Sequence, residues 1–305
     1  MLARLWSSPT LLLVIPPLCW SGNFVIGRAM HADVPPMALS FWRWTLAFVL
    51  VVGFAAPHLR RDLPLLWRQR GLVALLAFLG IASFNALVYT GLASTSVVNG
   101  VLMQSTMPVL ILVCSVAIFG EPVRRLQTLA ILISLAGVAV VMTRGSLETV
   151  RSLSLSAGDG LIFLAVVFYA MYSVLLRRRP PVHPLSFLAA IFLVGALMLV
   201  PMLAWEHTAG RVMHLNAASL LSILYVGIFP SIVAYLCFNR GVELIGANRA
   251  GQFVHLMPVF GTALAAIFLG ERLAISHLAG AALIATGIAI AQLRPARDLH
   301  QQPLQ

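Results

Sequence analysis

Ten apolar segments constrain this chain more than any other feature of its sequence. Each is about 20 residues long, and a helix of that length crosses a hydrocarbon core of roughly 30 Å. Backbone groups in lipid must find their hydrogen bonds within the segment, so we expect each segment to be a helix. The segments run over 9–29, 36–56, 71–93, 96–119, 125–143, 158–176, 185–205, 217–239, 247–269 and 274–293.

The composition agrees with a surface that faces lipid. Hydrophobic residues make up 60% of the 305 residues, charged residues only 10%, and the mean hydropathy is +0.96. A soluble domain usually carries charge on about a quarter of its residues. We therefore expect the lipid bilayer to surround this protein.

The formal net charge of +11 comes entirely from arginine, since the sequence contains no lysine. The arginines lie singly or in short clusters between apolar segments, which is typical of loop charges that orient membrane helices. A nucleic-acid groove would need clustered basic residues with exposed aromatic side chains, so no nucleic-acid partner is predicted. With the N-terminus in the cytoplasm, about fourteen arginines fall inside and about five outside. This bias predicts cytoplasmic N- and C-termini.

The second half of the sequence repeats the first at a distance of about 150 residues. Five segments fall in each half, 1–150 and 151–305, and an odd number makes the second half insert from the opposite side. We predict an all-α membrane protein with ten helices in two inverted five-helix repeats. Pairs 150 residues apart are Met107-Pro108 with Met257-Pro258, Gly91 with Gly241, Gly120-Glu121 with Gly270-Glu271, and Gly137 with Gly287, whereas Trp20, Asn23 and Arg28 match Tyr169, Tyr172 and Arg177 at a distance of 149.

Several motifs also resemble those of a known family. They are Trp20-Ser21-Gly22-Asn23-Phe24 with Arg28, Phe41-Trp42-Arg43-Trp44, and the paired Phe119-Gly120-Glu121 and Leu269-Gly270-Glu271-Arg272. Over about residues 10–293 the chain resembles the EamA family of the drug/metabolite transporter superfamily. The resemblance implies a transporter in the bacterial inner membrane that exports amino acids or related small molecules. It leaves the substrate, the direction of transport and the oligomeric state open, and a monomer is compatible with it.

Two prolines at equivalent positions indicate where a substrate could bind. Pro108 and Pro258 each lie near the middle of a segment, and a proline there leaves the carbonyl four residues earlier without its helical donor. Such interrupted helices often face the central cavity of a transporter built from repeats. We therefore predict that both prolines break or gate helices beside a cavity at the bilayer midplane.

Polar side chains at helical spacing give the candidate binding residues. Pairs three or four residues apart share one face of a helix. Amides, phenols and an indole would suit a neutral or zwitterionic solute with an apolar body. An intramembrane amide or phenol also commonly serves only to join two helices. The candidates are Trp20 and Asn23; Asn85 and Tyr89; Asn99 and Gln104; Tyr169 and Tyr172; Tyr235 and Asn239; and Gln252 and His255.

Arg43 is the one arginine well inside a segment. A charge there is costly unless it pairs, reaches the interface or faces water. Asp159 at the outer end of the sixth segment is a possible partner, and contact with a substrate carboxylate is the alternative. Trp42 and Trp44 flank Arg43, but neighbours on a helix point in different directions, so no cation–π contact is inferred.

Glu121 and Glu271 each end a segment, and Arg124 and Arg272 lie close to them in sequence. We expect these glutamates to form interfacial ion pairs that fix helix ends. His255 is the titratable candidate for coupling transport to protons, since no acidic residue falls at the middle of a segment. Facilitated movement down a gradient is the alternative.

Two other classes of function are alternatives to a carrier: a membrane-embedded enzyme and a passive channel. A membrane-embedded enzyme would need a motif such as His-Glu-x-x-His or Gly-x-Ser-x-Gly, and the sequence has neither. The three cysteines lack metal-ligand spacing, so no metal or cofactor is predicted. A passive channel would favour a symmetric oligomer with one ring of selective groups. Inverted repeats with a central cavity favour a carrier that works by alternating access.

Overall fold

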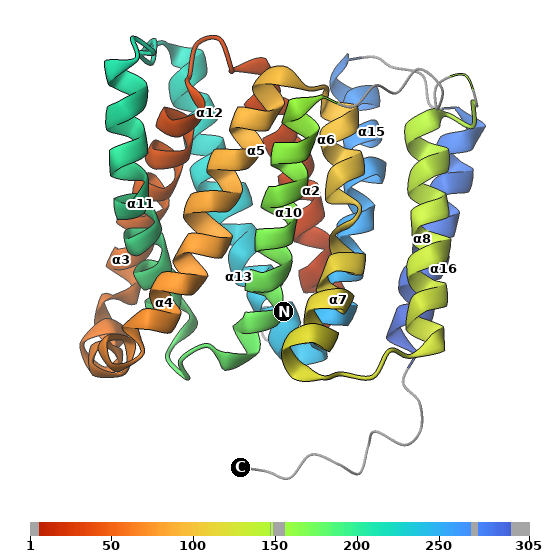
Figure 1. Cartoon of the computed structure of the whole chain (residues 1–305), viewed down its shortest axis with the longest axis horizontal. Helices are drawn as coiled ribbons and strands as arrows, with labels where there is room; N and C mark the ends of the chain where they lie inside the picture. Colours follow the sequence, from red (N-terminus) through yellow and green to blue (C-terminus); the bar gives the residue numbers. More distant parts are fainter. Residues whose placement is uncertain (1–5, 147, 149–155, 270–273, 294–305) are drawn as a thin grey trace.

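The chain folds into a bundle of long helices that stand side by side, shown in Figure 1. This computed structural model describes residues 6–146, 148, 156–269 and 274–293, and over these residues it contains helices and no strand. The first half comprises α2 (Pro9–Ala29), α3 (Pro36–Arg68), α4 (Arg70–Ala77), η1 (Phe78–Ala82), α5 (Ser83–Ser94), α6 (Val97–Gln104), α7 (Met107–Phe119) and α8 (Arg125–Thr143).

The second half has the same order of elements. It comprises α10 (Ala157–Leu175), η2 (Leu176–Arg178), α11 (Pro184–Thr208), α12 (Ala217–Gly227), η3 (Ile228–Val233), α13 (Ala234–Ile245), α14 (Ala247–Gly251), η4 (Gln252–His255), α15 (Leu256–Leu269) and α16 (Ile275–Gln292).

Nine of the ten predicted membrane-spanning segments correspond to long apolar helical segments among the described residues. Within the described residues, nine helical segments are long and apolar enough to cross a bilayer. The predicted segment 247–269 consists of α14, η4 and α15 and is not among these nine. The all-α fold class is therefore confirmed. The second segment was predicted too short: α3 continues past Pro57 and Pro64 to Arg68, where buried Asp62 accepts a hydrogen bond from the His183 backbone N–H (3.0 Å).

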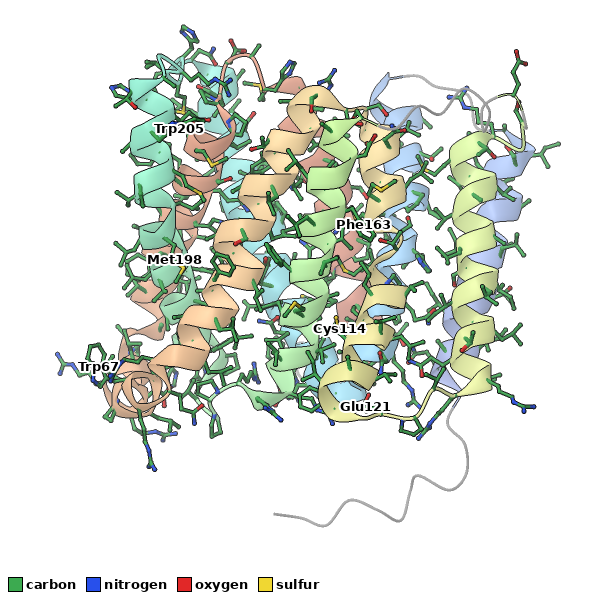
Figure 2. The ribbon with its side chains drawn as sticks, in the orientation of Figure 1. Trp67, Cys114, Glu121, Phe163, Met198 and Trp205 are labelled. Carbon is green, nitrogen blue, oxygen red and sulfur yellow. The ribbon has the colours of Figure 1, made fainter. Side chains whose placement is uncertain are left out.

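The two ends of the bundle differ in charge. One end, called here the Arg-rich end, holds the ends of α3, α7 and α16 and the start of α8 (Figure 1); Arg68 is in the last turn of α3, and Arg124 and Arg125 are at the start of α8. Exposed tryptophans lie near both ends: Trp67 at the Arg-rich end beside the level of Glu121, and Trp205 at the opposite end (Figure 2). Amphipathic rings prefer the two membrane–water interfaces, so these tryptophans agree with a bilayer between them.

Each repeat contains one π-helix that the sequence did not predict. The π-helices η1 and η3 begin at Phe78 and Ile228, which are 150 positions apart. The fourth and ninth segments are also interrupted at matching places, between α6 and α7 and at η4. Single π-turns inside α-helices are frequent at functional sites because they free a backbone carbonyl.

The helices α8 and α16 form a closely packed pair at one margin of the bundle (Figure 1). A Cβ atom on Gly137 would lie 2.7 Å from the carbonyl oxygen of Gly280, and one on Gly287 would lie 2.6 Å from that of Ala130. Glycine is therefore required for this close approach of two backbones, as is common between membrane helices.

Candidate functional site

Arg43 is the centre of a buried polar cluster. Its side chain is 1% exposed, yet it comes from the lipid-embedded part of α3. Every acceptor around it is neutral, and two of them belong to the second repeat. The contacts are Nε to Ser231 Oγ (2.6 Å); Nη1 to Asn23 Oδ1 (2.9 Å), Asn85 Oδ1 (2.8 Å) and Tyr89 OH (2.8 Å); and Nη2 to the Pro230 carbonyl (3.0 Å).

The predicted pairing of Arg43 with Asp159 is wrong. Asp159 instead accepts hydrogen bonds from Thr95 Oγ1 (2.5 Å) and Asn99 Nδ2 (3.2 Å), and it forms a capping box with Ser156 at the start of α10. The acid is held at the helix end by these closer donors. Among the described residues, no carboxylate lies within ion-pair distance of Arg43.

The guanidinium of Arg43 also lies over an aromatic ring. Its Cζ is 4.7 Å from the centroid of Trp44, a cation–π contact that helix geometry alone gave no reason to infer. The long arginine side chain reaches back over the adjacent ring, whereas Trp42 is 44% exposed on the outer face. A ring beneath a desolvated cation stabilises it by about 2 kcal/mol.

A backbone carbonyl of each π-helix accepts hydrogen bonds from side chains of the other repeat. The Pro230 carbonyl of η3 accepts from Trp20 Nε1 (3.2 Å) and from Arg43, both in the first repeat. The Gly80 carbonyl of η1 accepts from the Tyr235 hydroxyl of the second repeat. Gly80 and Pro230 are 150 positions apart, so each repeat caps the same carbonyl of the other.

An aromatic cluster fills the space beside Arg43. The rings of Tyr169 and Tyr172 are 5.2 Å apart, and Tyr169 lies 5.6 Å from Trp20 and 6.0 Å from Tyr235. The Tyr172 hydroxyl donates to Asn239 Oδ1 (3.0 Å). The Tyr169 hydroxyl has no hydrogen-bond partner although it is buried. The structure thus gathers eight candidates around one centre: Trp20, Asn23, Arg43, Asn85, Tyr89, Tyr169, Tyr172 and Tyr235.

The interrupted helices meet in a second polar group. His255 Nε2 lies 2.9 Å from the carbonyl of Ser105, which is its counterpart 150 positions earlier. A carbonyl only accepts, so Nε2 carries the proton, and Nδ1 is left as a buried acceptor without a partner. Gln252 and Gln104, 0% and 2% exposed, also have side-chain atoms without partners.

The two prolines lie just after these interruptions. Pro108 is in the first turn of α7, and Pro258 is the third residue of α15. Proline is tolerated in the first turn because the N–H there lacks a helical partner in any case. The breaks themselves lie at Ser105 and Thr106 and at η4, before each proline.

A cleft opens at the Arg-rich end. It has a volume of about 1560 Å³ and lies between the loop after α7 and helix α8 of the first repeat and η2, α13 and α14 of the second. Of the candidate binding residues, Asn239 lines it and the Arg43 cluster does not. The expected central cavity is not seen at Arg43, where hydrogen bonds and aromatic packing join the described parts of the two repeats.

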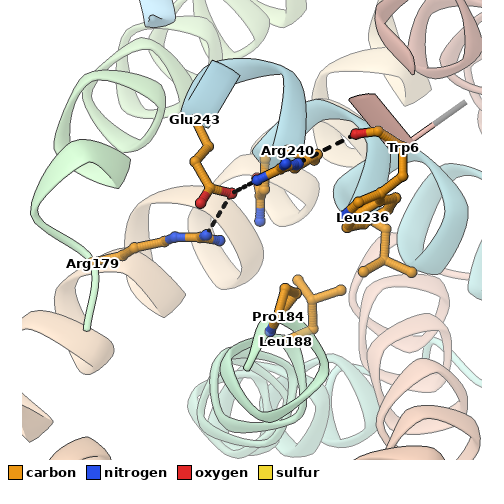
Figure 3. Close-up of a pocket in the computed structure, with 8 residues that line it drawn as sticks. Trp6, Arg179, Pro184, Leu188, Leu236, Arg240 and Glu243 are labelled. Atoms are coloured by element: carbon orange, nitrogen blue, oxygen red, sulfur yellow. Dashed lines mark hydrogen bonds and ion pairs between the residues drawn. The ribbon is translucent and has the colours of Figure 1, made fainter. Parts of the chain in front are cut away.

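Ion pairs surround the mouth of the cleft. Glu121 pairs with Arg177 and accepts from Asn248 Nδ2 (3.0 Å), so its ion-pair partner comes from the other repeat, not from nearby Arg124 as predicted. Glu243 binds Arg179 (2.9 Å) and Arg240 (3.0 Å) beside a small pocket of about 10 Å³, shown in Figure 3. Glu271 and Arg272 lie outside the described residues.

Sequence reasoning missed four groups at the Arg43 cluster, and Asn99 lies outside both polar groups. Ser231, Trp44 and the carbonyls of Gly80 and Pro230 contact the cluster, and only Pro230, a proline inside a segment, gave a signal in the sequence. Asn99 lies instead beside Asp159 near the opposite end. No group of three or more His, Cys, Asp or Glu residues within the described ranges could hold a metal ion.

The comparison with family models decides the family. The EamA-like transporter family model matches twice, over residues 7–143 and 156–292. This chain belongs to the EamA-like transporter family. The two matches correspond to the two halves of the fold, each with one π-helix and one interrupted helix.

Known relatives of this EamA-like protein are named as transporters. The uncharacterized transporter YyaM of Bacillus subtilis is 30% identical over 256 residues, which cover 83% of each chain. An uncharacterized transporter of Archaeoglobus fulgidus is 25% identical over 87% of this chain and 91% of its own. The protein is thus a membrane transporter of the drug/metabolite transporter superfamily.

A solved crystal structure has the same fold. It superposes with a TM-score of 0.74 and 22% sequence identity, covering 94% of this chain and 96% of the other. At this identity the likeness establishes the fold and leaves the substrate to the chemistry of the site.

Proposed function

We propose that this protein is a secondary transporter that moves small metabolites, amino acids and related molecules among them, by alternating access between its two repeats. The observation that carries the proposal is the cleft of about 1560 Å³ at the Arg-rich end, closed toward the opposite end by hydrogen bonds that join the repeats. A pathway open at one end and closed at the other is what one state of such a carrier requires.

The closed part lies directly beyond the floor of the cleft. Asn239, Tyr235 and Ser231 follow each other by one turn along α13 and η3, from the cleft to the Arg43 cluster. Asn239 and Ser231 are eight residues apart, so Ser231, which contacts Arg43, lies about 12 Å along the helix from Asn239. A solute that passes must break the bonds of Arg43 to Ser231 and Pro230, which makes them the inner gate.

Inverted repeats supply the second state. Because the halves are equivalent, the counterparts of the cleft residues would line an opening at the opposite end after the exchange. Leu244 and Arg249 line the cleft, and their counterparts 150 positions earlier are Ser94 and Asn99. Asn99 thereby keeps a place in the pathway as a proposed outer residue. We further propose that the protein lies in a bacterial inner membrane and that its termini are cytoplasmic, at the Arg-rich end. In this orientation it would export its substrate.

Counterflow in proteoliposomes tests the proposal. Vesicles that contain the purified protein are loaded with unlabelled L-leucine or L-phenylalanine, and uptake of the same labelled amino acid is followed. A carrier gives saturable uptake that internal substrate accelerates. Flux that rises linearly with concentration and ignores internal substrate would indicate a channel, and no protein-dependent flux of any metabolite in an export screen would contradict transport.

A further inference from the structure

Hydrogen-bond donors outnumber acceptors around Arg43. A guanidinium offers five N–H groups and no acceptor, and an indole offers one N–H and no acceptor. Nη2 of Arg43 carries two hydrogens but makes one bond, to the Pro230 carbonyl. The Nε1 of Trp44, whose ring lies under the guanidinium, is buried without a partner. Unpaired buried donors are costly, which indicates that an acceptor from outside the chain completes the site.

The missing acceptor should carry negative charge. All five contacts of Arg43 are with neutral groups. A buried cation without a counter-charge is strongly disfavoured in the membrane, and such residues commonly mark substrate pathways. Described carboxylates near the spans lie toward their ends: Asp33, Asp62, Glu121, Asp159, Glu206 and Glu243. The structure therefore offers Arg43 a place for an anion and offers a substrate ammonium no carboxylate nearby.

The cleft that leads toward the site is also predominantly positive, like Arg43. The cleft is lined by five arginines and two glutamates, and clefts lined by one sign of charge concentrate ligands of the opposite sign. The arginines are Arg124, Arg125, Arg177, Arg179 and Arg249.

The walls around Arg43 are aromatic. Trp44 packs against Phe192 (4.9 Å between centroids) and Tyr235 (5.2 Å), and Trp20 packs against Phe238 (5.5 Å). Such walls suit a flat apolar body with a small charged group at one end.

We propose that the substrate is an organic monoanion whose carboxylate binds Arg43 and whose apolar or aromatic body lies among these rings, with no ammonium required. The proposal rests on the proposed transport function and specifies the charge of its cargo. In this structure the Pro230 carbonyl accepts from both Arg43 and Trp20, which is the place that an anionic oxygen of the substrate would take. Binding of the anion thus replaces a contact between the repeats and loosens the inner gate.

Four probes of similar shape test the charge requirement: 3-phenylpropionate, neutral 3-phenylpropionamide, cationic 3-phenylpropylamine and zwitterionic L-phenylalanine. Binding to the full-length protein in nanodiscs is measured by calorimetry. We expect 3-phenylpropionate to bind at least tenfold more tightly than the amide and the amine not to bind. Equal binding of acid and amide, or no binding of the acid, would overturn the proposal.

The substitution Asn23→Asp separates recognition from folding. It places a carboxylate 2.9 Å from Nη1 in the space of the native amide, so Arg43 gains an internal counter-charge. We expect the preference for the acid to fall at least tenfold while the melting temperature is kept or raised. A purely structural Arg43 would be better satisfied and would leave the preference unchanged, which would contradict the proposal.

Asn216→Asp is the matched control. Asn216 caps α12 at the opposite end, where aspartate caps equally well, so acid binding should stay at the wild-type level. Counterflow with the same probes separates the two proposals. Saturable counterflow of the amide or amine but not of the acid would support the proposed carrier function and contradict the proposed anionic substrate. Acid-selective binding without counterflow of any probe would contradict the proposed carrier function and support an anion-binding site at Arg43.

Discussion

Each repeat contains a hydrogen bond from a tyrosine hydroxyl to an asparagine side chain, with the two residue types in swapped positions. The side chain that lies beside this bond differs between the repeats. In the first repeat the Tyr89 hydroxyl donates to Asn23 Oδ1 (2.6 Å), and in the second Tyr172 donates to Asn239 Oδ1 (3.0 Å). Tyr89 corresponds to Asn239 and Asn23 to Tyr172, at distances of 150 and 149.

The difference lies in the helix beside each pair. The first repeat adds Arg43 from α3, whereas the second places Phe192 of α11 at the matching position 149 residues later, fully buried against Trp44 and Tyr235. The fold is thus duplicated while the charge is confined to one half. In the proposed mechanism, the symmetric backbones would allow alternating access, and Arg43 would give the pathway its chemical selectivity.

Removing the cation should have the largest effect. In Arg43→Gln the amide cannot replace five N–H contacts, so we expect counterflow to fall at least a hundredfold, on the scale of losing a buried charged partner of 3–5 kcal/mol. The transport rate is measured in proteoliposomes with equal amounts of protein that is monodisperse in detergent. Unchanged transport would remove Arg43 from the binding site.

Adding a cation at the matching position of the second repeat should destabilise the protein. In Phe192→Arg the guanidinium would meet aromatic rings where Arg43 meets Asn and Ser oxygens, so we expect the melting temperature to fall by about 5–10 °C. The control Phe192→Leu keeps the site apolar and should cost about half as much. If Phe192→Arg were as stable as Phe192→Leu, the neutral acceptors would not be what makes Arg43 tolerable.

Weakening one reciprocal contact should shift the balance between states. In Tyr235→Phe the Gly80 carbonyl loses its donor from the other repeat, which costs about 1–3 kcal/mol in the closed gate. We expect a cysteine at Ser231 to react at least fivefold faster with a thiol reagent than in a Tyr235 background, both without Cys19, Cys114 and Cys237. An equal labelling rate would contradict the role of this bond in the gate.

Histidine at the helix break should not couple transport to protons. His255 donates from Nε2 to Ser105, and a proton on Nδ1 would find no acceptor in the described part of the chain. Flux should therefore change less than twofold when a pH gradient is imposed, with the membrane voltage clamped. A pH-driven flux that His255→Ala abolishes would establish coupling instead.

The surface ion pair at the cleft should matter least. Glu121 and Arg177 are 34% and 50% exposed, so Glu121→Gln should cost less than about 1 kcal/mol. We expect at most a threefold change in transport rate, measured at low and high salt. A loss comparable to that of Arg43→Gln would move the main electrostatic contact to the mouth of the cleft.

The fold could be predicted because lipid imposes a simple rule on the chain. Apolar length locates the spans, and the recurrence of Met107-Pro108 as Met257-Pro258 reveals the repeats. The end of α3 could not be placed, since Pro57 and the following arginines resemble a loop until contacts with α11 are known.

The site was predictable only in part. Spacing on single helices identified Asn85 and Tyr89, which both contact Arg43, and Tyr169 and Tyr172, whose rings lie 5.2 Å apart. The hydrogen-bond partners of Arg43 come from three elements, α2, α5 and η3, that are far apart in sequence, and a π-helix leaves no mark in composition. The pattern Ser156-x-x-Asp159 did carry a capping signal that explains why Asp159 is occupied elsewhere.

Distances between spin labels on both sides of the membrane test alternating access most directly. Arg125 and Leu244 lie across the cleft, and their counterparts 150 positions away, Ile275 and Ser94, lie at the opposite end. We expect two populations for each pair, and 3-phenylpropionate should shift one pair toward the longer distance as it shifts the other toward the shorter. A single unchanged distance at the opposite end, with and without the probe, would contradict exchange of the cleft between the two repeats.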